Sequence, residues 1–460
     1  MNSDETFDRE LRATLAELAH EPAPDRLVAR VAQIPSVELL PRLHAVRLHL
    51  SPRGLGSGFA LLAAGVAVAV LAILVRPGAG PSPVGGSPSL AIGATESPAA
   101  SSALVLPSSS PVAQGSQSPT SSAAPVPAAF EPMSATFVSA EKGWVLGSIP
   151  CGTARCPAIV RTLDGGVTWS SIGVPGTKVG GRAPGSIGGS AGISSLRFAD
   201  PLDGWAFGPE LWATHDGGVT WGQVSIVGLP AGATVAVLET ASGTVHAVLY
   251  DGAQDFRIAS SRVGSEGWRV ASVPIPVGAG PVPRVELVLS GEGGWVLANN
   301  RVVTAGARLE AGTWRTWKPA CLDVVGPAVL GASSTSDLVA ACDVGQWSNP
   351  QGDHLFTSHD GGTTFVETGP RTPLTGASAV ATPGRSTIVV AGNDARGATL
   401  VGTFDGGQTW ATVLSAGPVE FADLGFTTST QGIVVTTDST GAGHLLMTRD
   451  GGLTWHQVLF

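Results

Sequence analysis

Five aspartates recur in one eight-residue pattern, S/T-x-D-G-G-x-T-W/F, and carboxylates are groups that do acid–base chemistry or bind metal ions. The five are Asp164, Asp216, Asp360, Asp405 and Asp450. A calcium loop would need further carboxylates at alternate positions, and this pattern has none. Catalytic acids converge on one site, whereas these recur along the chain. We therefore expect each Asp to accept backbone N–H bonds in a tight turn whose Gly pair takes positive φ.

The four cysteines are the other candidates for metal or redox chemistry. They form no C-x-x-C pair and none stands near a histidine at zinc spacing, so we expect no metal site and no cofactor. In an oxidising compartment the even number predicts two disulfides, Cys151–Cys156 and Cys321–Cys342, with unpaired buried thiols as the alternative. The nine histidines are scattered. No G-x-S-x-G elbow indicates a nucleophilic serine.

The aspartate turns belong to a longer repeat that begins near residue 131. Its aromatic landmarks are Trp169, Trp221, Trp268, Trp317, Phe365, Trp410 and Trp455, in steps of 52, 47, 49, 48, 45 and 45 residues. Each unit contains four short runs broken by Gly, Asp or Pro, which is typical of a propeller blade. We predict an all-β fold, a seven-bladed β-propeller with four-stranded blades over residues 131–460. The third and fourth units keep the spacing but have lost the aspartate turn.

The repeated pattern resembles the Asp box of bacterial neuraminidase repeats, which sialidases, sortilin-type receptors and photosystem II assembly or stability-factor propellers share. Gly-Trp pairs on the second strand, at Trp144, Trp205 and Trp295, look closest to the assembly-factor type. The resemblance covers residues 131–460 and implies a propeller. It says little about chemistry, because a fold does not give a function.

The resemblance also implies what a sialidase-like site would contain: an arginine triad, a tyrosine nucleophile backed by a glutamate, and an acid/base aspartate. The chain has one tyrosine, Tyr250, and no arginine motif of that type precedes the first aspartate turn. We therefore favour a non-catalytic module that binds a protein client or an envelope ligand, as an assembly factor, scaffold or sensor. The alternative is an exo-α-sialidase-like glycoside hydrolase acting on envelope or host glycans.

Loops between strands two and three, and between blades, should share the face opposite the aspartate turns, because successive strands alternate in direction. Loops on a rigid scaffold are common recognition sites, and Trp347 is the expected aromatic anchor. Cys321 and Cys342 should also meet at this face. The candidate binding residues are Lys178, Arg182, Tyr250, Asp251, Asp255, Trp347, Asp353, Asn393 and Arg396. Ordinary solvated loops are the alternative for each.

The first 130 residues differ in composition from the repeats. Residues 55–75 carry no charge and are numerous enough to span a bilayer, so we predict a transmembrane helix at 54–76, with a cleaved signal peptide as the alternative. Several arginines precede this segment, whereas after Arg76 the next cation is Lys142, which places the N-terminus in the cytoplasm. We predict short amphipathic helices in residues 1–53 and a disordered Pro/Ser/Ala-rich stalk over 77–130.

Charge and topology set the partners that we expect. The formal charge of -9 comes without a Lys/Arg-rich run, which argues against a nucleic-acid partner. The single-pass topology places the propeller on the extracytoplasmic side of the plasma membrane, where a protein or a glycan is the expected ligand. Residues 1–53 are either a docking segment for a cytoplasmic protein or a solvated leader. No residue indicates a photosynthetic host.

Overall fold

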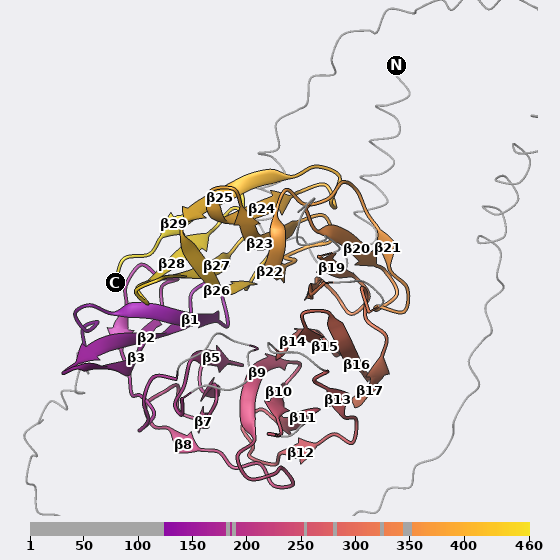
Figure 1. Cartoon of the computed structure of the whole chain (residues 1–460). Coiled ribbons are helices and arrows are strands. Elements are labelled where there is room, and N and C mark those ends of the chain that lie inside the picture. Colours follow the sequence, from indigo (N-terminus) through magenta and orange to yellow (C-terminus); the bar gives the residue numbers. More distant parts are fainter. Residues whose placement is uncertain are drawn as a thin grey trace, which may run out of the picture. The chain divides into compact units, whose positions relative to one another are not determined.

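The computed structural model describes residues 124–180, 185, 190–252, 255–278, 283–322, 326–343 and 352–460. The regular elements of this part are β-strands in seven antiparallel sheets, which Figure 1 shows as blades around a centre. The predicted all-β, seven-bladed propeller is confirmed. Among the described residues no helix is long and apolar enough to cross a membrane. The predicted segments 1–53 and 54–76 and nearly all of the stalk 77–130 lie outside the described residues.

Blades 1 to 3 follow one another along the chain, and within each blade the chain steps outward from the innermost strand. Blade 1 contains β1 (Glu131–Phe137), β2 (Gly143–Cys151), β3 (Ala154–Thr162) and β4 (Ser170–Ser171). Blade 2 contains β5 (Ser195–Phe198), β6 (Gly204–Phe207), β7 (Leu211–Thr214) and β8 (Gly222–Gln223). Blade 3 contains β9 (Thr234–Ala241), β10 (Thr244–Tyr250), β11 (Asp255–Arg262) and β12 (Arg269–Val270), with β13 (Ile275–Pro276) also paired to β11.

Blades 4 to 7 repeat the same order. Blade 4 contains β14 (Pro283–Ser290), β15 (Gly293–Asn300), β16 (Val303–Glu310) and β17 (Thr313–Trp317). Blade 5 contains β18 (Ala328–Ala332), β19 (Leu338–Cys342), β20 (His354–Ser358) and β21 (Val366–Glu367). Blade 6 contains β22 (Thr375–Ala381), β23 (Ile388–Asp394), β24 (Gly397–Thr403) and β25 (Ala411–Gly417). Blade 7 contains β26 (Val419–Phe426), β27 (Gly432–Asp438), β28 (Gly443–Thr448) and β29 (His456–Gln457).

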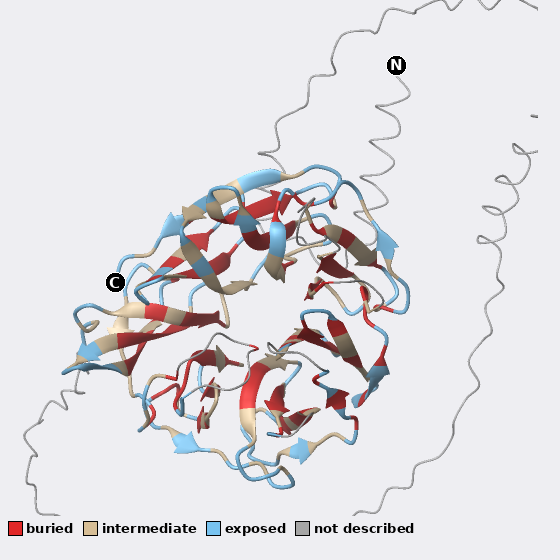
Figure 2. Ribbon diagram, viewed as in Figure 1, coloured by how far each residue is buried: buried red, intermediate tan, exposed pale blue. Residues whose placement is uncertain are grey.

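The hydrophobic core lies between neighbouring blades. Seven clusters of buried side chains each join one blade to the next, and Figure 2 shows the buried residues concentrated in the middle strands of the blades, with exposed residues at the outer edges. At the closure, Phe137 and Val145 of blade 1 pack with Ile433 and Met447 of blade 7. The four main strands of every blade are consecutive in sequence. Packing of blade 7 against blade 1 therefore closes the ring, and no strand is exchanged between these blades.

The Gly-Trp pair of the second strand packs against the innermost strands. Trp144 is 1% exposed and stacks on Phe198 of blade 2, with ring centroids 4.0 Å apart. A Cβ atom on Gly143 would overlap the ring of Phe137, and one on Gly204 would overlap the ring of Phe198. The glycine thus leaves room for an aromatic ring of its own blade, while the tryptophan fills the space between blades.

The five aspartate turns join the third and fourth strands of their blades. In blade 1 the Asp164 carboxylate accepts bonds from the N–H groups of Val167 (3.1 Å) and Thr168 (2.9 Å) and from the hydroxyls of Thr162 and Thr168. The two following glycines have φ of 74° and 91°, a region that glycine adopts at little cost. Bonds from the Thr168 hydroxyl and N–H, and then from Thr162, lower the pKa of Asp164 to about 2. The same bonding recurs at Asp216, Asp360, Asp405 and Asp450.

Blades 3 and 4 close their outer hairpins in other ways. In blade 4 a two-residue turn joins β16 to β17, with Ala311 and Gly312 at φ of 46° and 74°, the geometry of a type I′ hairpin. Trp317 is the last residue of this outer strand, whereas the other landmark aromatics precede their outer strands. In blade 3 the indole N–H of Trp268 donates to Glu266 at 2.9 Å.

Both predicted disulfides are present. Cys151–Cys156 closes the hairpin between β2 and β3, with Cα atoms 5.8 Å apart. Cys321–Cys342 joins the segment after blade 4 to the end of β19, with Cα atoms 6.2 Å apart. Both separations lie within the usual range for a disulfide. The second bridge therefore ties the connection after blade 4 to blade 5.

Candidate functional site

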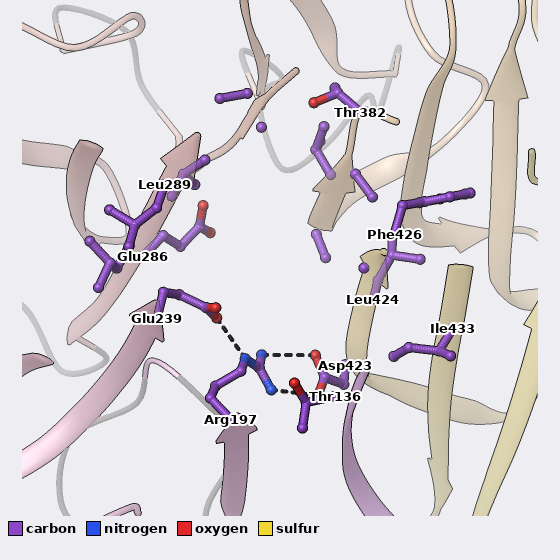
Figure 3. Close-up of a pocket in the computed structure, with 18 of the residues that line it drawn as sticks. Thr136, Arg197, Glu239, Glu286, Leu289, Thr382, Asp423, Leu424, Phe426 and Ile433 are labelled. Atoms are coloured by element: carbon purple, nitrogen blue, oxygen red, sulfur yellow. Dashed lines mark hydrogen bonds and ion pairs between the residues drawn. The ribbon is translucent and has the colours of Figure 1, made fainter. Parts of the chain in front are cut away.

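A cavity of about 710 Å³ lies among the innermost strands (Figure 3). All seven of these strands contribute to its wall, mostly through their C-terminal halves. Those ends lead into the turns between first and second strands, which share a face with the aspartate turns because the strands are antiparallel. The cavity therefore extends toward the aspartate-turn face. Its volume is within the range of pockets that bind small molecules.

Arg197 of β5 links several blades across this cavity (Figure 3). Its Nε donates to Glu239 of β9 at 2.8 Å, and its two Nη atoms donate to Asp423 of β26 at 3.0 and 3.1 Å. The Asp423 carboxylate also accepts bonds from the Ser134 hydroxyl (2.9 Å) and the Ala135 N–H (3.2 Å) of β1. Blades 7, 1, 2 and 3 thus share one network. The Asp423 side chain is 7% exposed and that of Arg197 is 17% exposed.

The network keeps the guanidinium of Arg197 charged. Burial opposes the charge of Arg197, but attraction by Asp423 and then Glu239 outweighs it and raises the pKa of the guanidinium above its ordinary value. Burial raises the pKa of Glu239, and Arg197 counteracts only part of that shift. Two carboxylates therefore serve one guanidinium. Arg197 is left with little capacity to bind an anionic ligand.

Glu286 of β14 lies in the cavity wall outside this network. Its Oε2 accepts the backbone N–H of Leu330, on the neighbouring β18, at 2.9 Å. Burial raises the pKa of Glu286 to about 7, although the Leu330 N–H and the positive charge of Arg284 both lower it. An ordinary glutamate is fully ionised at neutral pH. With a pKa of about 7, the Glu286 carboxyl is instead partly protonated at neutral pH.

The rest of the wall is apolar or carries hydroxyl groups, with Phe198, Leu289, Leu424 and Phe426 among the apolar members and Thr382 among the hydroxyls. The residues that line the cavity include no histidine, cysteine, tyrosine or lysine. No cluster of three His, Cys, Asp or Glu side chains suited to a metal ion occurs within the described ranges. The wall can therefore hold a ligand through ion pairs, hydrogen bonds and apolar burial.

The sequence-predicted binding residues lie elsewhere, on the second-to-third-strand turns and the connections between blades. Those with a described position are Lys178 after β4, Tyr250 at the end of β10, Asp251 and Asp255 around the following turn, Asp353 before β20, and Asn393 and Arg396 around the β23–β24 turn. None of these lines the cavity. Arg182 and Trp347 lie outside the described residues.

Two of these predicted residues are buried. Asp353 is 1% exposed, and its Oδ2 accepts the N–H of Ala377 at 2.7 Å, which ties blade 5 to blade 6. Burial raises the pKa of Asp353 to about 6. Asp251 is 8% exposed, accepts the N–H of Asp255 at 3.2 Å and bonds to Arg257 at 3.4 Å. These two carboxylates hold loops in place, whereas Lys178, Asn393 and Arg396 are exposed.

The connection that carries Lys178 also reaches the centre of the ring. Gly185 donates its N–H to the Ala236 carbonyl at 2.9 Å and accepts the Val285 N–H at 2.8 Å, so it lies between β9 and β14. Its φ is 78°, and a Cβ atom would overlap the Val285 carbonyl. Glycine is therefore required where this connection contributes to the cavity wall.

The sequence did not single out the charged residues of the cavity: Arg197, Glu239, Glu286 and Asp423. A usable signal was present, since each interrupts an apolar run in the first strand of its unit, as Arg197 does in Ser-Leu-Arg-Phe. The first strand of each blade is the innermost one, so it lies between the rest of the blade and the centre of the ring, and its residues are mostly apolar. A charged residue there must point into the ring or pair across it.

No protein-family model and no curated protein matches this chain. Among solved structures, "YCF48 bound to D1 peptide" is 18% identical, covering 71% of this chain and 95% of that chain at a TM-score of 0.48. YCF48 from Cyanidioschyzon merolae is 15% identical, covering 71% and 98% at 0.48. The GH74 enzyme of Niastella koreensis is 13% identical, covering 71% of each chain at 0.37. These are similarities of fold only.

Proposed function

We propose that the propeller is a non-catalytic binding module that takes a segment of a client protein into its central cavity. The cavity wall carries this proposal: its central guanidinium is already bound by two carboxylates, and the lining brings no histidine, cysteine, tyrosine or lysine. A rigid ring whose charged side chains are already held in place loses little conformational entropy when it binds a ligand. The Gly-Trp pairs at Trp144, Trp205 and Trp295, which look closest to the assembly-factor type, favour a protein over a glycan.

The opposite face provides a second contact surface in this proposal. Lys178, Asn393 and Arg396 are exposed there, and Trp347 is the proposed aromatic anchor. A client that enters the cavity from the aspartate-turn face leaves these loops free for a second partner. An envelope glycan is the other ligand that these polar loops suit.

The proposal also places this Asp-box propeller outside the cytoplasm, on a membrane anchor. It is supported by the uncharged run 55–75, by the arginines on its N-terminal side, and by two disulfides, which suit an oxidising compartment. A cytoplasmic protein at residues 1–53 would complete the assembly. We expect the full-length chain to resist carbonate extraction of membranes and its propeller to be cut by protease added outside intact cells. Extraction into the soluble fraction would refute the anchor.

A glycoside hydrolase is the second candidate, and Glu286 favours it. A carboxyl group whose pKa is near 7 suits a general acid, and the carboxylates beside Arg197 would supply the base. Tyr250, the nucleophile that a sialidase resemblance implies, does not line the cavity. Turnover of a fluorogenic sialoside by the full-length chain, lost in Glu286→Gln or Tyr250→Phe, would establish this candidate. Absence of turnover favours the binding module.

Photo-crosslinking tests the binding proposal. A photoreactive phenylalanine is placed at Thr382 in the cavity wall, and the matched control carries it at Val227, which is 88% exposed and outside the cavity. Both full-length variants are irradiated in native membranes, and adducts are identified by mass spectrometry. We expect a discrete client adduct at Thr382 that Val227 does not give. Identical adducts at both positions, or none at Thr382, would refute a client in the cavity.

A further inference from the structure

We propose that the cavity selects a positively charged group of its client, a lysine ammonium or an arginine guanidinium, and holds it against Glu286. This inference rests on the proposed binding function and names the chemistry of the bound segment. Three observations carry it: the balance of charge in the wall, the partners of Glu286, and the space beside it.

The wall has more negative than positive groups. Its charged residues are Arg197, Arg284, Glu239, Glu286 and Asp423. Arg197 is bound by two of the carboxylates, and no ion pair joins Arg284 to Glu286 in the described part of the chain. Arg284 is exposed, so solvent screens its charge. When Glu286 is ionised, three carboxylates face two guanidiniums, so the wall carries a net formal charge of one negative, and Glu286 is the carboxylate that no ion pair compensates.

Folding alone does not account for a carboxyl group at this position. Glu286 is half-buried on the cavity side of β14, whereas Val285 and Leu287 on either side of it are buried, and its only described hydrogen bond is from the Leu330 N–H. An apolar side chain would avoid the cost of removing a carboxyl group from water. A cation from outside the ring would compensate that charge. Partly buried charged groups that lack a full set of partners at a cavity are often binding groups.

The space beside Glu286 suits such a cation. The cavity holds about 710 Å³, which is enough for a lysine or arginine side chain. Leu289 and Leu424 offer apolar surface for the methylene groups of a lysine or arginine. An anionic segment would meet the surplus carboxylate, since Arg197 is already engaged. The cavity therefore discriminates between charges of opposite sign.

Binding of a cation should be coupled to loss of the Glu286 proton. The charged groups of the wall around this carboxyl are Arg284 on the same strand, Glu239 on the neighbouring β9 and, beyond Glu239, Arg197 and Asp423 (Figure 3). A bound cation favours the ionised form, so the complex releases a proton at pH values where free Glu286 is protonated. Affinity should rise by up to tenfold per pH unit toward about pH 7 and level off above it.

Calorimetry with a defined probe tests this inference. The full-length chain in detergent is titrated with tri-arginine amide and with tri-glutamate at pH 6, 7 and 8. Glu286→Gln keeps an acceptor for the Leu330 N–H, and Glu292→Gln, on the exposed turn after β14, is the matched control. We expect Glu286→Gln to weaken tri-arginine binding by about tenfold or more and to abolish its pH dependence, with Glu292→Gln unchanged.

Other results overturn the inference. Equal affinity of Glu286→Gln and wild type, preference for tri-glutamate, or no binding of tri-arginine amide to the wild type would each do so. Crosslinking at Thr382 separates the two proposals. If the Thr382 adduct persists unchanged in the Glu286→Gln background, the client occupies the cavity without using this carboxyl, and only the cation proposal fails. If no adduct forms even with Glu286 intact, the binding function fails as well.

Discussion

Asp423→Asn should destabilise the ring at its closure. The carboxylate of Asp423 takes two bonds from Arg197 and one each from Ser134 and Ala135, so it joins blade 7 to blades 1 and 2. Removing one partner of a buried ion pair costs about 3–5 kcal/mol. In this variant the Glu239 carboxylate still compensates the charge of Arg197, and the asparagine amide oxygen can still accept the bonds from Ser134 and Ala135 of blade 1. We therefore expect a loss of about 2 kcal/mol in the free energy of unfolding, or a fall of roughly 4 °C in Tm.

Urea unfolding followed by tryptophan fluorescence measures this loss. Asp438→Asn is the control, because its carboxylate is exposed in a turn of blade 7 and bonds only locally, to Thr440 and Ala442. A double-mutant cycle with Arg197→Met should show coupling between Arg197 and Asp423. A loss below about 0.5 kcal/mol for Asp423→Asn, or additive effects in the cycle, would refute the view that this network closes the ring.

Two further changes test other parts of the structure. Replacing Cys321 and Cys342 by serine removes a disulfide that closes a loop of 21 residues, and loop entropy predicts a loss of about 3 kcal/mol in the free energy of unfolding. The same change at Cys151 and Cys156, which are 5 residues apart, should cost about 2 kcal/mol. Urea unfolding measures both losses, and the reverse order would contradict this prediction. Burial lowers the pKa of His246 from 6.5 to about 4. As the pH falls from 6.5 to 4, the histidine therefore gains a proton in the unfolded chain but not in the folded one. The free energy of unfolding should drop by up to about 3 kcal/mol over this range. Unfolding of His246→Gln at pH 7 and pH 5 should show a smaller drop, and an equal drop would contradict this assignment.

The blades could be predicted because their signals are local. Alternating runs, glycine pairs and one aromatic per unit each lie within about ten residues, and together they fix strands, turns and blade number. The cavity network could not be found in this way. Arg197 and Asp423 are 226 residues apart, and only closure of the ring brings them to hydrogen-bonding distance.

The candidate binding residues show a second limit of the sequence. Asp353 was expected as a recognition residue because it lies in a loop, yet its carboxylate bonds to the backbone of the next blade. A loop position does not reveal which side chains face inward, since that depends on neighbouring blades. The roles of Arg182 and Trp347, the cytoplasmic segment and the transmembrane helix stay predictions.

Blades 3 and 4 show what the repeat requires when its aspartate is lost. In blade 4, the indole N–H of Trp317 donates to the Gly362 carbonyl at 2.8 Å, and Arg308 donates to the Gly361 carbonyl at 2.9 Å. Both acceptors belong to the aspartate turn of blade 5. Gly361 and Gly362, both with positive φ, thus present their carbonyls to the neighbouring blade, whereas the Asp360 carboxylate bonds only within its own turn. A blade can therefore replace the carboxylate with a type I′ hairpin and keep its place. The seven clusters between blades, more than the five carboxylates, hold the ring around its cavity.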